Sequence, residues 1–361
     1  PVKRVEIPKD NGKMRLLGIP TVVDRLVQQA INQVLTPIYE DQFSKTSYGF
    51  RPRRGCHDAL RGAQRIINEG YIYVVDLDLE RFFDTVSHSK LIEIFSRTIK
   101  DGRVVSLIHK YLRSGVMNKG LFEASEEGTP QGGPLSPLLS NIMLNELDKE
   151  LERRGLPFVR YADDSMIFCK SKRAAMRVKE SITRFIEKTL YLKVNKEKTV
   201  VSYVRGVKYL GYSFYVMKGK CQLTVHPKSK AKMKSRLKEL TSRSNGWGYA
   251  KRKQKLKEYI RGWVGYYHLA NMKRLLLETD EWLRRRIRMC IWKAWKKVKT
   301  KVANLIRCGI NKYKAYEWGN TRKGYWRIAN SGILHRAITN EHLCRAGYAT
   351  LMEAYLEWYP K

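Results

Sequence analysis

Two adjacent acidic residues, Asp163 and Asp164, constrain the fold and the chemistry of this chain more than any other feature. They lie between the apolar runs 158–161 and 165–169, which predict two paired strands with the acids at the tip of the hairpin. A tight turn holds the two like charges together, and a hard divalent cation with oxygen ligands is the simplest relief of their repulsion. An Asp-Asp pair alone is also typical of an ordinary solvated turn.

A second strand that ends in acids favours the metal interpretation. The β-branched and aromatic run 71–75 predicts a strand buried on both faces. Asp76 and Asp78 follow this run on one face, because side chains alternate with a period of two. An acid in this position can be a plain strand terminus. Together with the Asp163-Asp164 hairpin, however, it predicts a two-metal site for phosphoryl transfer.

Short motifs occur in a fixed order along the chain. They are residues 7–9 (Ile-Pro-Lys), 17–21 (Leu-Gly-Ile-Pro-Thr), 47–52 (Ser-Tyr-Gly-Phe-Arg-Pro), 78–84, 128–137 (Gly-Thr-Pro-Gln-Gly-Gly-Pro-Leu-Ser-Pro), 161–164 (Tyr-Ala-Asp-Asp) and 209–212 (Tyr-Leu-Gly-Tyr). In this order they resemble the reverse transcriptases, and most closely the group II intron-encoded type, the intron maturases. The resemblance covers the whole chain and implies an RNA-directed DNA polymerase with an α+β right-hand fold.

The pattern of the sequence changes along the chain and predicts several domains. Residues 1–70 mix short strands with a helix expected from about Val23 to Leu35, ending before Pro37. Strands and helices alternate in the next part, a hairpin is expected within 206–225, and helices follow. The resemblance implies fingers (1–70), palm with part of the fingers (71–226), a helical thumb or maturase domain (227–314) and a C-terminal DNA-binding region (315–361).

The resemblance also implies which acids bind metal. In this family the first catalytic acid is followed, five residues later, by an aromatic residue that lies under the sugar of the incoming nucleotide. Asp78 has Phe83 at that offset, whereas Asp76 has Arg81. Asp78 is therefore the expected metal ligand and Asp76 a supporting acid.

The full site implied by the resemblance is a two-ion magnesium centre, for which Mn²⁺ is a possible substitute. One ion would activate the primer 3′-hydroxyl and the other would hold the triphosphate. The expected catalytic residues are Asp78, Asp163 and Asp164, with the Leu79 carbonyl as a further metal ligand.

Residues outside the acids match family positions that contact the nucleotide or the primer. Lys9 and Arg15 correspond to cations that grip the triphosphate, although a solvated hairpin would also suit them. Gln131 corresponds to a residue near the nucleotide sugar and the template, and the alternative is a simple loop before a helix. The nucleotide-binding residues are expected to be Lys9, Arg15, Phe83 and Gln131, and the primer grip Tyr209, Leu210 and Gly211.

The charge of the chain points to nucleic acid. The chain carries 71 Lys+Arg against 34 Asp+Glu, a net charge of +37. Residues 228–300 alone hold 23 basic and 5 acidic side chains, a concentration typical of a phosphate-binding surface. The resemblance implies as partners the intron RNA, an RNA template, a DNA primer or target, and deoxynucleoside triphosphates. The cations expected to contact nucleic acid are Lys251, Arg252, Lys253, Arg284, Arg285 and Arg288.

Other uses of the basic region stay open at this point. The helical spacing of apolar and basic residues over 283–298 also fits calmodulin or lipid binding. No run of 18 apolar residues occurs, so a membrane span is not expected. The six cysteines contain no Cys-x-x-Cys pair, which argues against a zinc-bearing endonuclease domain and favours a reducing compartment, the bacterial cytoplasm.

Two alternative functions accompany the main hypothesis, which is a polymerase that also binds its intron RNA, assists splicing and copies the intron during retrohoming. One alternative is a reverse transcriptase of another bacterial element, of the diversity-generating or CRISPR-associated type. The other is an RNA-binding splicing cofactor without polymerase activity. The chain begins at Pro1, only a few residues before the first motif, and an N-terminal extension is expected to precede it.

Overall fold

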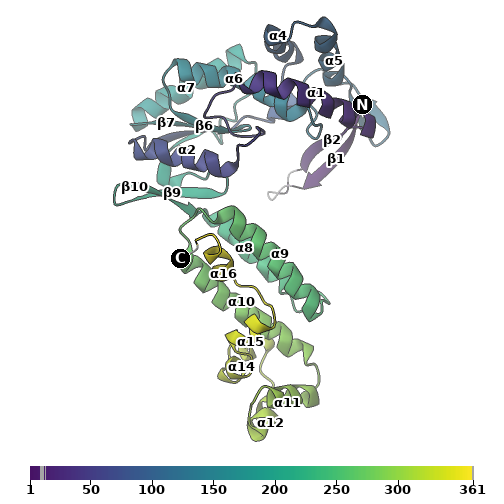
Figure 1. Ribbon diagram of the computed structural model, residues 1–361, viewed down its shortest axis with the longest axis vertical. Coiled ribbons are helices and arrows are strands. Elements are labelled where there is room, and N and C mark those ends of the chain that lie inside the picture. The colour runs from purple at the N-terminus through teal and green to yellow at the C-terminus, as the bar shows by residue number, and fades with distance from the viewer. Residues whose placement is uncertain (9–11, 13, 360–361) are drawn as a thin grey trace. The chain divides into compact units, whose positions relative to one another are not determined.

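A computed structural model describes residues 1–8, 12 and 14–359 of the chain. The chain divides into two compact units (Figure 1). The first unit comprises Pro1–Leu210 and Phe214–Cys221, and the second comprises Gly211–Ser213 and Gln222–Lys361. The predicted α+β class is confirmed, because the first unit contains mixed sheets and helices and the second is mainly helical.

The central sheet of the first unit carries the acidic strand ends. Its order is β6-β7-β3-β8, and every neighbouring pair is antiparallel. Its strands are β3 (Tyr73–Leu77), β6 (Phe158–Tyr161), β7 (Asp164–Cys169) and β8 (Val200–Tyr203). The predicted hairpin at Asp163-Asp164 is therefore confirmed as β6–β7.

Both faces of strand β3 are covered, as the sequence predicts. Val75 and Leu77 point into the main hydrophobic core, to which α6 (Ser136–Arg153) and α7 (Lys172–Thr189) contribute. Val74 is buried on the opposite face, where α2 (Cys56–Asn68) packs against β6. The buried strand provides a rigid support for the acids that follow it.

A second sheet in the first unit carries the N-terminal motifs, in the order β2-β1-β4-β5. Strand β1 pairs antiparallel with β2 and parallel with β4. The strands are β1 (Val2–Pro8), β2 (Met14–Ile19), β4 (Val116–Asn118) and β5 (Leu121–Glu123). The short helices of this unit are α3 (Phe82–Thr85), α4 (His88–Thr98) and α5 (Gly102–Leu112), with the 3₁₀ turn η1 (Val204–Gly206).

Helix α1 (Val22–Glu40) is longer than the sequence predicts, because it continues through Pro37. A proline inside a helix removes one backbone hydrogen bond and usually ends the helix. Here the next turn is held by tertiary contacts, since Tyr39 is buried and its hydroxyl donates to the Phe95 carbonyl at 3.0 Å. The predicted end before Pro37 is wrong because packing offsets the cost of the proline.

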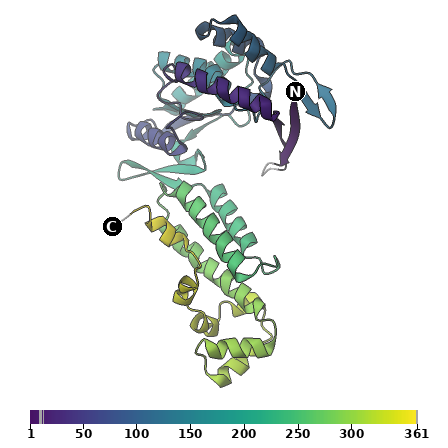
Figure 2. The same cartoon turned by 45° about the vertical axis from the view of Figure 1, so that its right-hand side comes forward.

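The second unit is built on long helices that pack side by side (Figures 1 and 2). Helix α8 contacts α9 and α10, and both α9 and α10 contact α16. The carboxylate of Asp280 on α10 accepts hydrogen bonds from Leu351 N and Met352 N at 2.9 Å each, which caps α16. The helices are α8 (Pro227–Leu240), α9 (Tyr249–Tyr267), α10 (Lys273–Ala294), α11 (Val298–Arg307), α12 (Lys312–Gly319), α13 (Tyr325–Ile328), α14 (Gly332–Ala337), α15 (Asn340–Arg345) and α16 (Leu351–Leu356).

The expected hairpin within 206–225 is confirmed as β9 (Tyr212–Met217) and β10 (Lys220–Val225). Its turn residues Lys218 and Gly219 have φ values of 51° and 74°. Positive φ at both positions is the conformation that suits a two-residue hairpin. Among the described helices, none is both long enough and apolar enough to cross a membrane.

Candidate active site

The two acids at the β6–β7 turn are held in a constrained conformation. Tyr161 pairs with Asp164, so that Ala162 and Asp163 form the turn. Ala162 has φ = 58°, a left-handed conformation that costs a non-glycine residue roughly 1–2 kcal/mol. Such strain persists only where the surroundings enforce it.

A buried ion pair behind the turn enforces this conformation. Arg160 is fully buried, and its Nη1 donates to the Ala162 carbonyl at 3.0 Å and to Asn141 Oδ1 at 2.9 Å. Its Nε and Nη2 donate to the two carboxylate oxygens of Asp148 on α6, at 2.8 and 2.5 Å. Arg160 therefore positions the turn that carries Asp163.

Sequence reasoning missed this pair, although a signal was present. Arg160 is a charged residue inside an otherwise apolar strand, and a buried charge requires a partner. The partner lies on a different element, and its spacing along the chain gives no indication of the pairing.

The motif at residues 47–52 packs directly against the same turn. Tyr48 N donates to the Arg160 carbonyl at 2.9 Å, and the Gly49 carbonyl accepts from Asn141 Nδ2 at 2.9 Å. A Cβ atom on Gly49 would lie 2.2 Å from the Ala162 nitrogen, so only glycine fits there. Within the same motif Arg51 is buried and paired with Glu40, which is a structural role.

The carboxylates at the two strand ends repel one another. Burial raises the pKa of Asp164 to about 6, and the charges of Asp163 and Asp78 add to the rise. Burial likewise raises the pKa of Asp76 to about 6, with further contributions from Asp164 and Asp78. For Asp163, burial also raises the pKa, Asp78 adds to this effect and Arg15 opposes it. The structure thus brings the predicted acids together, with Arg15 near them.

A lysine supplies positive charge to this cluster. Lys198 Nζ lies 3.2 and 3.3 Å from the two carboxylate oxygens of Asp78. Among the described residues, no set of three Asp, Glu, His or Cys side chains is already arranged to enclose a metal ion. Lys198 was not predicted, because it lies far from the acids in the sequence, in a lysine-rich loop that is typical of a solvated surface.

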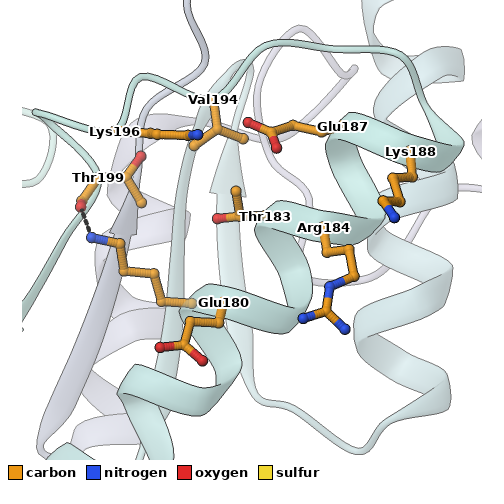
Figure 3. A pocket seen from close by; sticks show the side chains of 9 residues that line it. Glu180, Thr183, Arg184, Glu187, Lys188, Val194, Lys196 and Thr199 are labelled. Carbon is orange, nitrogen blue, oxygen red and sulfur yellow. Dashed lines mark hydrogen bonds between the residues drawn. The ribbon is translucent and has the colours of Figure 1, made fainter.

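The loop that carries Lys198 is fixed to the segment after β3. Thr199 Oγ1 accepts a hydrogen bond from Asp78 N at 3.2 Å, and Asn195 N donates to the Asp78 carbonyl at 2.9 Å. On the other side, Lys179 Nζ on α7 donates to the Thr199 carbonyl at 2.6 Å (Figure 3). The cavity of about 450 Å³ drawn in Figure 3 lies along α7 and this loop, and none of the predicted acids lines it.

Three motifs meet around the predicted nucleotide contacts. Thr129 N donates to the Phe83 carbonyl at 2.6 Å, and Gly18 N donates to the Gln131 carbonyl at 2.9 Å. A Cβ atom on Gly132 would lie 2.6 Å from the Gly18 oxygen, so the loop can approach β2 only with glycine there. Phe83 is half-buried in α3, and Lys9 lies outside the described residues.

Of the predicted primer-grip residues, Tyr209 and Leu210 belong to the first unit and Gly211 to the second. Tyr209 is buried, and burial raises the pKa of its hydroxyl well above its usual value, with Asp164 adding to this rise. Leu210 and Gly211 follow with φ values of 48° and 83°, which form a sharp turn. Leu79 is the residue whose carbonyl is an expected metal ligand. Its side chain is buried, and its backbone forms an isolated antiparallel β-bridge with Val194.

Two of the cations predicted to contact nucleic acid are buried, and for these the prediction is wrong. Arg288 is 3% exposed and donates to the Ile338 carbonyl, which caps α14, and to Asn340 Oδ1, each at 2.8 Å. Arg252 is 5% exposed and donates to Asn245 Oδ1 at 3.1 Å. Both guanidinium groups therefore make hydrogen bonds within the protein and are not available to a nucleic acid.

The other predicted cations differ in their surroundings. Arg284 donates to the Asn340 carbonyl at 3.3 Å. Arg285 donates to the Trp326 carbonyl and stacks 3.8 Å from the centre of the Trp326 ring. Lys253 donates to the Ala346 carbonyl, whereas Lys251 is exposed. Arg284, Arg285 and Arg288 on α10 thus contact the C-terminal segment, which the periodicity of the helix does not reveal.

Comparisons with known families agree with the geometry. The sequence matches the reverse transcriptase (RNA-dependent DNA polymerase) family over residues 7–214 and the group II intron maturase-specific domain over residues 230–309. The first match covers more than half of the chain. The chain therefore belongs to the reverse transcriptase family, and its second unit carries the maturase-specific domain of group II introns.

Curated relatives match this chain over part of their length. Protein YkfC of Escherichia coli K12 is 37% identical over 251 residues, which cover 59% of this chain and 66% of that protein. The group II intron-encoded protein LtrA of Lactococcus lactis is 33% identical over 282 residues, 60% of this chain and 47% of that protein. The chain thus spans between about half and two thirds of the length of these relatives.

Solved structures support the fold. Apo telomerase from Candida tropicalis aligns with 99% of this chain and 64% of its own, with a TM-score of 0.50 and 14% identity. At that identity the likeness shows the right-hand fold alone.

Proposed function

We propose that this chain is an RNA-directed DNA polymerase encoded by a group II intron, which also binds the intron RNA and assists its splicing. The observation that carries the proposal is the convergence of Asp78, Asp163 and Asp164 at neighbouring strand ends in a reverse transcriptase fold. The maturase-specific match supports the splicing role and disfavours a reverse transcriptase of another bacterial element.

The acids fit a pair of Mg²⁺ ions. Asp78, Asp163 and Asp164 offer only hard oxygen ligands, and their mutual repulsion favours a divalent counter-ion. The Leu79 carbonyl is proposed as a further ligand. When bound, the ions lower the pKa of the primer 3′-hydroxyl and neutralise charge that develops on the triphosphate. The chain's own task is to hold the carboxylates in place. Arg160 contributes by its hydrogen bond to the Ala162 carbonyl, and Thr199 by accepting a hydrogen bond from Asp78 N.

The remaining residues orient the nucleotide and the primer. Arg15 is proposed to bind the triphosphate together with Lys9, because a guanidinium fork matches phosphate oxygens. Phe83 and Gln131 are proposed to lie against the sugar, and Tyr209, Leu210 and Gly211 to hold the primer end. Asp76 remains a supporting acid in the same cluster.

The domains are proposed as fingers (1–70), palm (71–226), thumb or maturase domain (227–314) and DNA-binding region (315–361). Nucleic acid is proposed to contact exposed cations of the second unit, and not Arg252 or Arg288, because these two side chains are buried. Exposed lysines and arginines on α8, α9 and α12 include Lys228, Lys234, Lys251, Lys255, Lys257, Arg261, Lys312 and Lys314. The RNA that co-purifies with the full-length protein tests the partner: enrichment of a group II intron supports the maturase role, and its absence contradicts it.

Phe83 is expected to exclude ribonucleotides, by occupying the space that a 2′-hydroxyl would need. Phe83→Val should raise ribonucleotide incorporation relative to deoxynucleotide incorporation by at least about tenfold, a change of ~1.4 kcal/mol in discrimination. Single-nucleotide extension with matched ribo- and deoxynucleotides measures this ratio. Phe82→Val is a useful comparison, because Phe82 is buried against Phe83 in the same helix. Unchanged discrimination in Phe83→Val would assign the gate to another residue.

Lys198 is expected to compete with divalent cations for Asp78. A positive charge 3.2 Å from a ligand oxygen weakens the binding of a further cation. Lys198→Met should therefore tighten Mn²⁺ binding by about three- to tenfold, since the pair is partly exposed and screened. Titration calorimetry of the wild type and the variant measures this change. Lys196→Met, in the same loop, serves as the control, and weaker Mn²⁺ binding in Lys198→Met would contradict the competition.

A further inference from the structure

The second unit contains a cavity that none of the proposed polymerase residues lines. Its volume is about 510 Å³, which is within the range of ~300–1,000 Å³ typical of small-molecule sites. Three aromatic residues, Tyr249, Trp295 and Tyr348, contribute to its walls together with aliphatic side chains. Lys253 and Arg307 also line it, and no Asp or Glu is among the lining residues that the structure describes.

The aromatic walls are well fixed. Tyr249 opens α9, and its hydroxyl is hydrogen-bonded to the side chain of Trp295, which follows α10. Tyr348 is 6% exposed, and its backbone nitrogen donates to the Leu343 carbonyl at 3.0 Å. Rigid aromatic surfaces lose little entropy when a flat ligand stacks on them.

The cations are placed to meet a negative charge at the cavity. Among the residues that the structure describes, the Lys253 ammonium makes one hydrogen bond, 2.7 Å from the Ala346 carbonyl, which leaves two of its donors for a ligand. Arg307 is the exposed last residue of α11, and its guanidinium makes no hydrogen bond or ion pair within the part of the chain that the structure describes. A ligand that suits this site has a flat, largely apolar body and carries negative charge.

We propose that this cavity binds one unstacked nucleobase of a single-stranded nucleic acid, with the neighbouring phosphates at Lys253 and Arg307. The inference rests on the proposed function, which brings an RNA or DNA strand to this unit. Base stacking on aromatic side chains, combined with cations along the backbone, is a common mode of single-strand binding.

A neighbouring surface suits the continuation of such a strand. Helix α12 packs against α11 and exposes Tyr313 and Tyr316, at 79% and 52% of their surface. Lys312 and Lys314 on the same helix are also exposed. Exposed tyrosines on the same helix as exposed lysines favour a nucleic-acid strand over an acidic peptide as the occupant of the cavity.

The test uses the full-length protein and labelled single strands of ~12 nucleotides: an RNA, the matching DNA and an abasic strand of the same length. The RNA and the DNA each carry one photoreactive thiobase. Ala346→Trp fills the exposed rim of the cavity, and Ala124→Trp adds the same side chain at an exposed position after β5 in the first unit. Fluorescence anisotropy measures affinity, and mass spectrometry of the photo-crosslinked peptides locates the base.

We expect the wild type to crosslink at Tyr249, Trp295 or Tyr348. Ala346→Trp should lose this crosslink and bind the base-containing strands about tenfold more weakly, with unchanged affinity for the abasic strand. Ala124→Trp should behave as the wild type. The strand that gives the stronger crosslink identifies RNA or DNA as the source of the base.

Arg307→Gln provides a second variant if Ala346→Trp does not fold. It should weaken the binding of all three strands and reduce the slope of log K against log salt by somewhat less than one unit. Crosslinks that occur only elsewhere in the wild type, or wild-type binding of base-containing strands by folded Ala346→Trp, would overturn the inference. If one of these outcomes is found but the wild type extends a primer normally, only the inference about the cavity fails and the proposed function is retained. Failure of the wild type both to extend a primer and to bind any strand would overturn both.

Discussion

Replacing Asp163 and Asp164 by alanine should lower primer extension by at least ~10³-fold while leaving RNA binding intact. Metal-assisted transfer needs the carboxylates, because the charge that develops on the phosphates otherwise goes uncompensated. Binding of folded RNA depends instead on shape and positive charge, which the double variant retains. Extension, RNA affinity and intron splicing are measured side by side on the purified protein.

A matched control is available in Glu126 and Glu127, an adjacent exposed acid pair of the same unit. Replacing both by alanine should leave extension nearly unchanged. Loss of splicing assistance in the Asp163/Asp164 variant, with its fold and RNA affinity intact, would contradict the separation of the two functions. Survival of extension would contradict the catalytic assignment.

Breaking the buried pair of Arg160 and Asp148 should have the largest effect on stability. Arg160→Met leaves an unpaired buried carboxylate, so the first unit should lose ~3–5 kcal/mol of its free energy of unfolding. The Ala162 carbonyl also loses its donor, so extension should fall as well. Urea unfolding and primer extension measure the two effects.

A double variant separates the role of Arg160 in positioning the Ala162-Asp163 turn from its contribution to the stability of the first unit. Arg160→Met combined with Asp148→Leu removes both charges, and it should regain much of the stability without regaining extension. Arg154→Met is the control, because its ion pair with Glu150 is partly exposed and such pairs contribute ~0–1 kcal/mol. Full recovery of extension in the double variant would show that Arg160 does not position the turn.

The sequence predicts the elements whose signals are local. The alternation around Asp76 and the apolar runs on both sides of Asp163 correctly place the central strand and the acidic hairpin. The Lys218-Gly219 turn likewise predicts the β9–β10 hairpin. Each of these features depends on neighbours within a few residues, where periodicity and turn chemistry dominate.

The features that sequence reasoning missed depend on distant partners. Arg160 is recognisable as a positioning residue only once Asp148 lies beside it, and Lys198 only once its loop lies against Asp78. Arg288 was misassigned because a basic helical stripe looks the same whether it faces solvent or the carbonyls of a neighbouring helix. Helix α1 passes Pro37 because of the packing of Tyr39, which local propensity does not contain.

Template-dependent extension by the full-length protein is the most direct test of the central claim. A DNA primer annealed to an RNA template is incubated with deoxynucleoside triphosphates and Mg²⁺, with Asp78→Asn as the paired variant. We predict that the wild type copies the template and that Asp78→Asn does not, although both are folded and bind the primed template equally. Equal extension by the two proteins, or no extension by a folded wild type that binds the template, would contradict the account.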